Sequence, residues 1–483
     1  MRNVNLLVGG SDRPASNGKT FDRHDPVSGV PVSRAAAASL DDVDAAVAAA
    51  SAAFPAWSEL SPGEKRMKLL DAADRMNARA AEFVAIGVEE TGGTAGWYHF
   101  NVSLAADMLR EAAAMTTQIG GETIPSNVPG CVAMSIRKPC GVVLGIAPWN
   151  APVILGVRAV AMPLACGNTV ILKASELCPG VHRLIGDVLQ SSGLGDGVIN
   201  ILLNAPEDAA IVVERAIANP AVRRVNFTGS TRVGRIVGEL AARHLKPSLL
   251  ELGGKAPFIV LSDANVDDAV AAAAFGAFMN QGQICMSTER IVVDETIADA
   301  FVEKLAAKAG ILKAGPPAAG NTPLGAVVSM AAVDRLRALL EDATAKGARI
   351  VAGGPSDNPI MQPTVVDRVT PAMRLYTEES FGPVVSVTRV HGDEEAVRVA
   401  NDNEYGLSAA VFSRDVSRAM QVARRIDSGI CHINGSTVHD EAQMPFGGVK
   451  ASGYGRFGGK SAINEFTDLQ WITVQTTTPQ YPI

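Results

Sequence analysis

The chain has 483 residues, of which 47% are hydrophobic and 19% are charged, and its formal net charge is −7. This length and composition are typical of a globular protein with two or three domains and a large buried core. The acidic balance and the absence of any run of five basic residues argue against nucleic acid or an anionic membrane surface as a partner.

Targeting, membrane and metal signals are missing from the sequence. Residues 1–30 contain no apolar run of signal-peptide length, and the best membrane candidate, Val153–Leu164, is interrupted by Arg158 and Pro163. The six cysteines form no CxxC pair, and the seven histidines form no HxxxH or HExxH pattern. We therefore expect a cytoplasmic protein without membrane contact, disulfides or a catalytic metal.

In chain order, helical apolar spacing comes first, and an alternating βα region follows it. Leu40–Ala53 and Pro62–Thr91 are predicted to be amphipathic helices. Five β-branched runs separated by helical segments then lie between Gly141 and Gly254: Val142–Ile146, Thr169–Lys173, Val198–Leu202, Arg224–Thr228 and Ser248–Leu252. Such alternation predicts βαβ units and a parallel sheet, whose strands have their carboxyl ends, and thus a ligand site, at one edge.

A second α/β domain is predicted after Gly254. Its strands are expected at Pro257–Leu261, Glu289–Val293, Arg349–Ala352 and Val384–Val390, and its helices at Val266–Phe278, Ala298–Leu312, Met330–Lys346 and Glu394–Asn401. Two further extended segments, Cys131–Lys138 and Leu469–Thr476, fit neither sheet. These two segments could pair with each other and are candidates for an oligomerisation arm; the alternative, equally compatible with the composition, is an α/β protein without such an arm.

Cys285 is the candidate nucleophile. It lies in Asn280-Gln-Gly-Gln-Ile-Cys-Met-Ser287, where small residues such as Gly282 and Ser287 leave room for a substrate. A thiolate adds readily to an aldehyde carbonyl, and loss of hydride from the adduct gives a thioester. The alternative is a buried cysteine that only fills space.

Two further polar residues are predicted at the ends of strands. The Asn150 amide can donate to the oxyanion of a tetrahedral adduct, or it can instead cap the next helix. Glu251 ends an apolar strand, where burial would raise its pKa toward that of a general base able to activate water. The alternative for Glu251 is a carboxylate that accepts hydrogen bonds from the amides of the glycines that follow it.

A cofactor site is indicated by a strand-to-helix turn, Phe227-Thr-Gly-Ser-Thr-Arg-Val-Gly234, although no GxGxxG motif follows the first strand. Backbone N–H groups at the start of a helix favour an anion such as a pyrophosphate. Lys173 and Glu176 follow the second strand and can bond ribose hydroxyls, or they are solvated surface charges. A carboxylate at this place repels a 2′-phosphate and so favours NAD over NADP.

Taken in order, these segments resemble the aldehyde dehydrogenase superfamily along essentially the whole chain. The matching motifs are Pro148-Trp-Asn150, Lys173-Ala-Ser-Glu176, Phe227-Thr-Gly-Ser-Thr231, Glu251-Leu-Gly-Gly-Lys255, Gly282-Gln-Ile-Cys285, Glu378-Glu-Ser-Phe-Gly-Pro383 and Pro445-Phe-Gly-Gly-Val-Lys-Ala-Ser-Gly-Tyr-Gly-Arg456. The resemblance implies a Rossmann-type parallel-sheet NAD domain at 1–117 and 139–251 and an α/β catalytic domain at 252–465. It also implies a β oligomerisation arm at 118–138 and 466–483 that forms a homodimer or homotetramer.

The resemblance also assigns roles to single residues. It makes Cys285 the nucleophile, Glu251 the general base and Asn150 the oxyanion donor, with NAD as the cofactor. The expected cofactor contacts are Ile146, Pro148, Trp149, Lys173, Ser175, Glu176, Gly229, Ser230, Val233, Leu252, Glu379 and Phe381.

Within the superfamily, Gly282–Arg290 and His432–Gln443 resemble the salicylaldehyde, vanillin and benzaldehyde dehydrogenases. This branch implies an aromatic aldehyde as substrate. The expected substrate pocket is lined by Trp97, Tyr98, Arg158, Ile284 and Phe446. The alternatives are an aliphatic or semialdehyde dehydrogenase, a CoA-acylating enzyme, which would generally lack the glutamate base, and a non-catalytic relative that only binds NAD.

Overall fold

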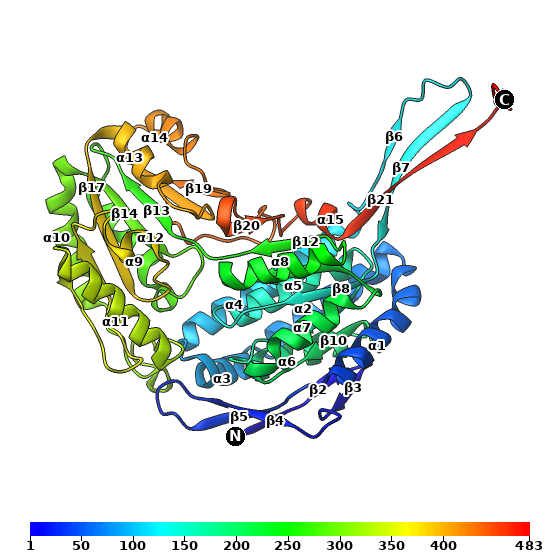
Figure 1. Cartoon of the computed structure of the whole chain (residues 1–483), viewed down its shortest axis with the longest axis horizontal. Coiled ribbons are helices and arrows are strands. Elements are labelled where there is room, and N and C mark those ends of the chain that lie inside the picture. The colour runs from blue at the N-terminus through cyan, green and yellow to red at the C-terminus, as the bar shows by residue number, and fades with distance from the viewer.

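The computed structural model describes residues 1–483 and has two large sheets and a projecting arm (Figure 1). The first sheet has the strand order β20 (Gly453–Tyr454), β12 (Ser248–Glu251), β11 (Val222–Thr228), β8 (Val142–Ile146), β9 (Thr169–Lys173), β10 (Ile199–Leu202), β2 (Leu6–Val8), β3 (Ser11–Arg13). The five strands from β12 to β10 are parallel, as predicted from their β-branched runs. Strands β20 and β2 join them in the antiparallel direction, and β3 pairs with β2 at the edge of the sheet.

Helices surround this first sheet. They are α1 (Leu40–Ser58), α2 (Pro62–Ala78), α3 (Ala80–Thr91), α4 (Ala95–Met115), α5 (Pro152–Ala165), α6 (Pro179–Ser191), α7 (Ala209–Ala218) and α8 (Thr231–Arg243). The stretch Pro62–Thr91, expected as one helix, is two, because α2 ends at Ala78 and Arg79 separates it from α3. Every residue of α5 is buried, since it lies between the sheet and helices α4 and α6.

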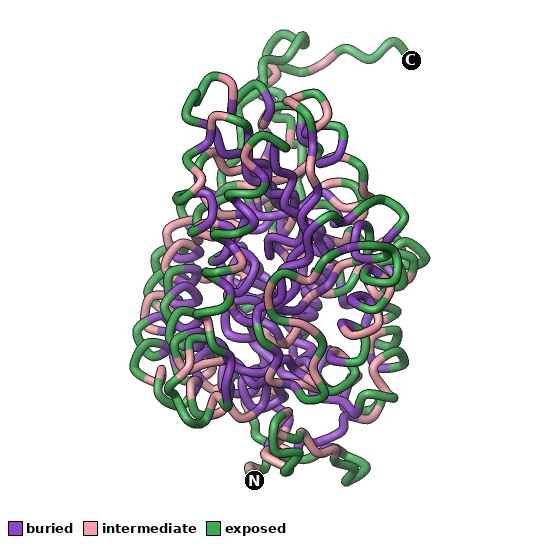
Figure 2. Tube along the Cα trace, turned by 90° about the vertical axis from the view of Figure 1, so that its left-hand side faces the viewer, coloured by how far each residue is buried: buried purple, intermediate pink, exposed green.

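The second sheet follows Gly254 in the chain. Its order is β15 (Arg349–Ala352), β16 (Thr364–Asp367), β17 (Val384–Val390), β14 (Thr288–Asp294), β13 (Ala256–Val260), β18 (Ser408–Phe412), β19 (Ile430–Ile433), and only β15 is antiparallel. One core includes side chains of α9 (Val266–Phe278) and α10 (Glu295–Ile311). A separate core includes side chains of α11 (Met330–Ala345), α13 (Gly392–Asn401) and α14 (Val416–Ala423). This sheet is therefore buried between two layers of helices. Figure 2 shows that the buried residues gather in the interior of the molecule and the exposed ones on its outside.

The arm is a three-stranded antiparallel sheet with the order β21 (Thr467–Gln475), β7 (Cys131–Pro139), β6 (Glu122–Ile124). The predicted pairing of Cys131–Lys138 with Leu469–Thr476 is thus confirmed, and Figure 1 shows the arm extending away from both large sheets. A further small sheet near the N-terminus has the order β1 (Arg2–Val4), β5 (Pro31–Ala36), β4 (Thr20–His24). The short helices are α12 (Arg374–Thr377) and α15 (Ser461–Glu465).

None of the helices is both long and apolar enough to span a bilayer.

Candidate active site

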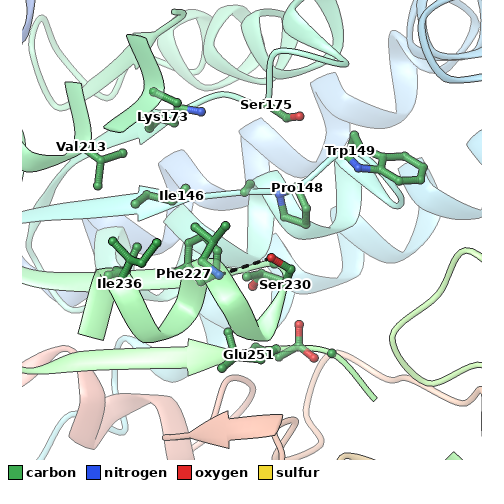
Figure 3. A pocket seen from close by; sticks show the side chains of 18 of the residues that line it. Ile146, Pro148, Trp149, Lys173, Ser175, Val213, Phe227, Ser230, Ile236 and Glu251 are labelled. Atoms are coloured by element: carbon green, nitrogen blue, oxygen red, sulfur yellow. Dashed lines mark hydrogen bonds between the residues drawn. The ribbon is translucent and has the colours of Figure 1, made fainter. Parts of the chain in front are cut away.

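A cavity of about 900 Å³ opens at the carboxyl ends of β8, β9, β11 and β12 (Figure 3). This volume lies in the range of natural ligand pockets. Cys285, Glu251 and Asn150 all line it, and so do all twelve residues expected to contact a cofactor: Ile146, Pro148, Trp149, Lys173, Ser175, Glu176, Gly229, Ser230, Val233, Leu252, Glu379 and Phe381. The predicted ligand edge of the parallel sheet therefore coincides with a real cavity.

Three chain segments meet at Cys285 with unusually close backbones. A Cβ atom on Gly254 would lie 2.3 Å from the carbonyl oxygen of Cys285. Gly282 has a φ of +67°, and a Cβ atom there would lie 2.0 Å from the carbonyl oxygen of Gly382. Only glycine permits these approaches. The segment after β12, the loop that carries Cys285 and the segment around Gly382 are consequently packed backbone against backbone.

Asn150 and the Cys285 loop are joined by reciprocal hydrogen bonds. Asn280 and Gln281 adopt left-handed backbone conformations, with φ of 47° and 55°. The Nδ2 atom of Asn280 donates to the carbonyl oxygen of Asn150 at 2.9 Å, and Nδ2 of Asn150 donates to the carbonyl oxygen of Gln283 at 2.9 Å. Helix α5 has no side-chain cap, so Asn150 does not have the alternative capping role. Its second amide proton stays free for a ligand.

Glu251 is 1% exposed, and neither of its carboxylate oxygens accepts a hydrogen bond from a nitrogen or oxygen donor of the chain; the neighbouring donor is the Cys285 thiol. This excludes the alternative in which the following glycine amides bind the carboxylate. Burial raises the pKa of Glu251 to about 7, opposed by the positive charge of Arg158. A carboxyl group with a pKa near neutrality that lines a ligand cavity has the properties of a general base.

Cys285 contributes the only thiol to the cavity wall. Burial, followed by the negative charge of Glu251, raises the pKa of the Cys285 thiol well above its usual value. The thiol is therefore protonated at neutral pH in this state, and its reaction as a nucleophile requires an acceptor for the proton. Glu251 is the carboxylate adjacent to it.

The opposite end of the cavity has the features of a nucleotide site. Lys173 is 6% exposed and its Nζ donates to Oε1 of Glu176, so these two residues are not freely solvated surface charges. Ser230 caps α8 by accepting a hydrogen bond from the Val233 N–H at 3.4 Å, drawn in Figure 3. The start of α8 thus faces the cavity with the partial positive charge that favours a phosphate.

Lys255 and Glu289 form a buried pair that the sequence did not single out. The Nζ atom of Lys255 donates to Oε2 of Glu289 at 2.8 Å, and Glu289 also accepts from the backbone N–H groups of Ser380 and Phe381 at 2.9–3.0 Å. The pair fixes the segment that carries Glu379, whose Oε1 accepts from the Gly254 N–H at 2.9 Å. The sequence does contain an indication of this pair, because a charged residue stands at or just before the start of each of two apolar strands.

The five residues expected at a substrate pocket do not line the large cavity. Trp97 donates from Nε1 to the carbonyl oxygen of Asn150 at 3.0 Å, and Ile284 is buried beside Cys285 in the chain. Arg158 lies over the Phe446 ring at 4.1 Å and pairs with a carboxylate oxygen of Asp440.

Tyr98 lies at the packing contact between α3 and α4. It is fully buried, and its ring leaves no room for a Cβ atom on Gly87 of α3. Its hydroxyl forms a 2.6 Å hydrogen bond with Thr91. These contacts give Tyr98 a role in packing.

Comparisons with known proteins agree with this geometry. The aldehyde dehydrogenase family profile matches residues 13–472. A vanillin dehydrogenase of Pseudomonas fluorescens is 65% identical over 483 residues, which is 100% of both chains. A benzaldehyde dehydrogenase [NAD(+)] of Pseudomonas putida is 38% identical and covers 95% of this chain and 94% of its own.

Among solved structures, a salicylaldehyde dehydrogenase from Pseudomonas putida G7 complexed with salicylaldehyde superposes with a TM-score of 0.99. It is 45% identical in sequence, and the match covers 100% of both chains. The chain belongs to the aldehyde dehydrogenase family.

The raised pKa of Glu251 predicts a pH-dependent cost to stability. Because the folded pKa of about 7 exceeds the ordinary glutamate value of 4.5, folding becomes less favourable as the pH rises from about 4.5 to 7. The variant Glu251→Gln lacks this titration. The free energy of unfolding of Glu251→Gln, relative to that of the parent protein, should therefore be higher at pH 8 than at pH 5, by up to about 3 kcal/mol.

Thermal unfolding of both proteins at the two pH values measures the change. Glu207→Gln, which removes an exposed carboxylate from the same cavity wall, is the matched control and should show no such difference. A constant gap between Glu251→Gln and the parent at pH 5 and pH 8 would contradict the assigned titration.

Proposed function

We propose that this aldehyde dehydrogenase oxidises an aromatic aldehyde to the carboxylate with NAD, through a thioester on Cys285. The observation that carries the proposal is that Cys285, Glu251 and Asn150 line the same cavity as the nucleotide-binding elements. A non-catalytic NAD-binding protein would have no use for a thiol and a buried, unbonded carboxylate at that position.

The chain's own residues account for the covalent steps. The Cys285 sulfur adds to the aldehyde carbon as Glu251 accepts the thiol proton, and the Asn150 amide with a backbone N–H stabilises the new oxyanion. The hydrogen on the adduct carbon leaves as hydride, for which a nicotinamide dinucleotide held in the cavity would be the acceptor, and the oxyanion becomes the carbonyl of the thioester. Glu251 releases the thiol proton to solvent and, again as a carboxylate, accepts a proton from water, whose oxygen attacks the thioester carbon. The carbon–sulfur bond breaks, the carboxylate leaves and the Cys285 thiolate is restored.

NAD rather than NADP is favoured by the charges around the cavity. Six glutamates line it, against three cationic side chains, Lys173, Arg243 and Arg335. Glu176, paired with Lys173, adds its charge where the resemblance expects the adenosine ribose. A 2′-phosphate would be repelled by the carboxylate of Glu176, while a ribose hydroxyl can donate to it. The benzaldehyde dehydrogenase [NAD(+)] named above supports the same choice.

An aromatic substrate is supported by the names of the vanillin, salicylaldehyde and benzaldehyde dehydrogenases to which the chain is similar. Aromatic side chains near Asn150 and Arg158 support the same choice. Trp97 bonds the backbone of Asn150, and Arg158 and Phe446 stack at 4.1 Å. We propose that Trp97, Arg158, Ile284 and Phe446 contribute to the substrate side of Cys285.

A substrate panel tests the proposed activity directly. With NAD, kcat/KM for vanillin, salicylaldehyde or benzaldehyde should exceed that for hexanal and succinic semialdehyde by about tenfold or more, because the proposed substrate side, with Trp97 and Phe446, would favour a ring over a chain. NADH absorbance is the readout, and Cys285→Ala should produce none.

Three other outcomes would contradict the proposal, and each points to a specific alternative. Higher kcat/KM for the aliphatic aldehydes would identify an aliphatic or semialdehyde dehydrogenase. An acyl-CoA product when CoA is added would identify a CoA-acylating enzyme. NAD binding without NADH formation from any aldehyde would identify a non-catalytic relative.

We also propose that the arm joins two or more copies of the chain. Strand β21 is at the edge of the arm sheet, and its side chains Leu469 and Trp471 are 61% and 74% exposed. An edge strand with large exposed apolar side chains on one face is typical of an assembly surface.

The variant Trp471→Lys, alone or with Leu469→Lys, should reduce the molar mass measured by light scattering from that of a dimer or tetramer toward a monomer. Gln470→Lys adds the same charge on the opposite face of β21 and is the control. An unchanged molar mass for the double variant would exclude this face of the arm as the interface.

A further inference from the structure

Asn204 lies directly behind Glu176, outside the wall of the cavity. It follows β10 and is 1% exposed. Its Nδ2 donates to Oε1 of Glu176 at 2.8 Å and to the carbonyl oxygen of Ala205 at 2.8 Å. Because both partners are acceptors, the orientation of the amide group is fixed.

These contacts make the two oxygens of the Glu176 carboxylate different in their hydrogen bonding. Oε1 accepts from both Asn204 and Lys173, whereas Oε2 receives no hydrogen bond from the chain. Glu176 lines the cavity and Asn204 does not. The carboxylate is therefore held from behind by one oxygen, and its other oxygen is available to a donor in the cavity.

Packing alone does not explain an asparagine at position 204. Its Oδ1 is buried and has no hydrogen-bond partner, which costs free energy that an apolar side chain of similar size would not cost. Asn204 is also not needed to complete the backbone hydrogen bonding at the end of β10. The Ala174 N–H already donates to the Leu202 carbonyl oxygen there, at 2.9 Å. The one polar side-chain partner of Asn204 is Glu176.

We propose that Asn204 is a positioning residue for cofactor selectivity: it fixes Glu176 so that Oε2 accepts from a ribose 2′-hydroxyl and the carboxylate excludes a 2′-phosphate. The inference rests on the NAD preference proposed above. A ribose diol presents O–H donors to Oε2, while a 2′-phosphate presents only acceptors and negative charge. A carboxylate free to rotate would lose both effects, because it could turn away from the ligand.

Equilibrium binding of NAD and NADP to the full-length protein tests the proposal by titration calorimetry. Asn204→Leu keeps the branched shape of the side chain and removes its donor, and Asn204→Ala is a second variant in case the larger leucine prevents folding. Either variant should lower the ratio of Kd for NADP to Kd for NAD by about tenfold, the effect expected from losing a hydrogen bond to a charged group.

Two comparisons separate positioning from a structural role. Asn200→Leu alters a fully buried asparagine of β10 that bonds only backbone groups, Gly9 N–H and the carbonyl oxygens of Val170 and Gly197, and it should leave the Kd ratio unchanged. In a Glu176→Gln background, Asn204→Leu should produce no further change in the ratio, because the charge that it positions is absent.

The outcomes distinguish this proposal from the one on which it rests. If Glu176→Gln changes the Kd ratio but both Asn204 variants leave it as in the parent, the positioning role is wrong and the NAD preference stands. If an Asn204 variant weakens NAD and NADP equally, its role is structural and the proposal is overturned. If Glu176→Gln itself leaves the ratio unchanged, the assignment of NAD preference to Glu176 fails, and the role of Asn204 fails with it.

Discussion

The close approach of three backbone segments around Cys285 is the constraint on which the site depends. Gly254 permits the end of the Glu251 strand to contact the carbonyl of Cys285, and Gly282 permits the same loop to contact Gly382. Any side chain at either position would separate these segments, because its Cβ would lie within 2.3 Å of a backbone oxygen. The first sheet supplies Glu251 and the second domain's segment supplies Cys285, so the catalytic group exists only where the two sheets meet.

The second feature is a buried carboxyl group that is only weakly compensated. Glu251 accepts no hydrogen bond from a nitrogen or oxygen donor of the chain, and its burial raises its pKa to about 7 despite the opposing positive charge of Arg158. By contrast, Glu289 accepts hydrogen bonds from Lys255 and two backbone amides. The structure thus contains one buried glutamate that is fully bonded and positions a loop, and another that is left reactive beside a thiol. This contrast is what supports a base role for Glu251 rather than a structural one.

Much of the architecture could be predicted because hydrophobic periodicity dominates it. Val142–Ile146, Thr169–Lys173 and Val266–Phe278 match the observed elements exactly, since continuous β-branched runs and helical apolar spacing are unambiguous there. The N-terminal strands, such as Thr20–His24, were not predicted. This strand has no fully buried residue and no apolar run that would mark it in the sequence. The pairs formed by Asn204 with Glu176 and by Lys255 with Glu289 join residues 28 and 34 positions apart, which no local pattern reports. The domain boundaries and the cytoplasmic location stay predictions.

The central claim, a thioester on Cys285 that Glu251 releases, can be tested most directly by mass spectrometry of the acid-quenched and digested protein. The parent and Glu251→Gln are each mixed with NAD and an aromatic aldehyde and quenched at successive times. The account predicts that the acyl group appears on Cys285 of the parent within one turnover. In Glu251→Gln the acyl group should form more slowly, because the thiol has lost its proton acceptor, and should then persist, because water has lost its base. An unmodified Cys285 in the parent at every time during turnover, or an acyl group on another residue, would contradict it.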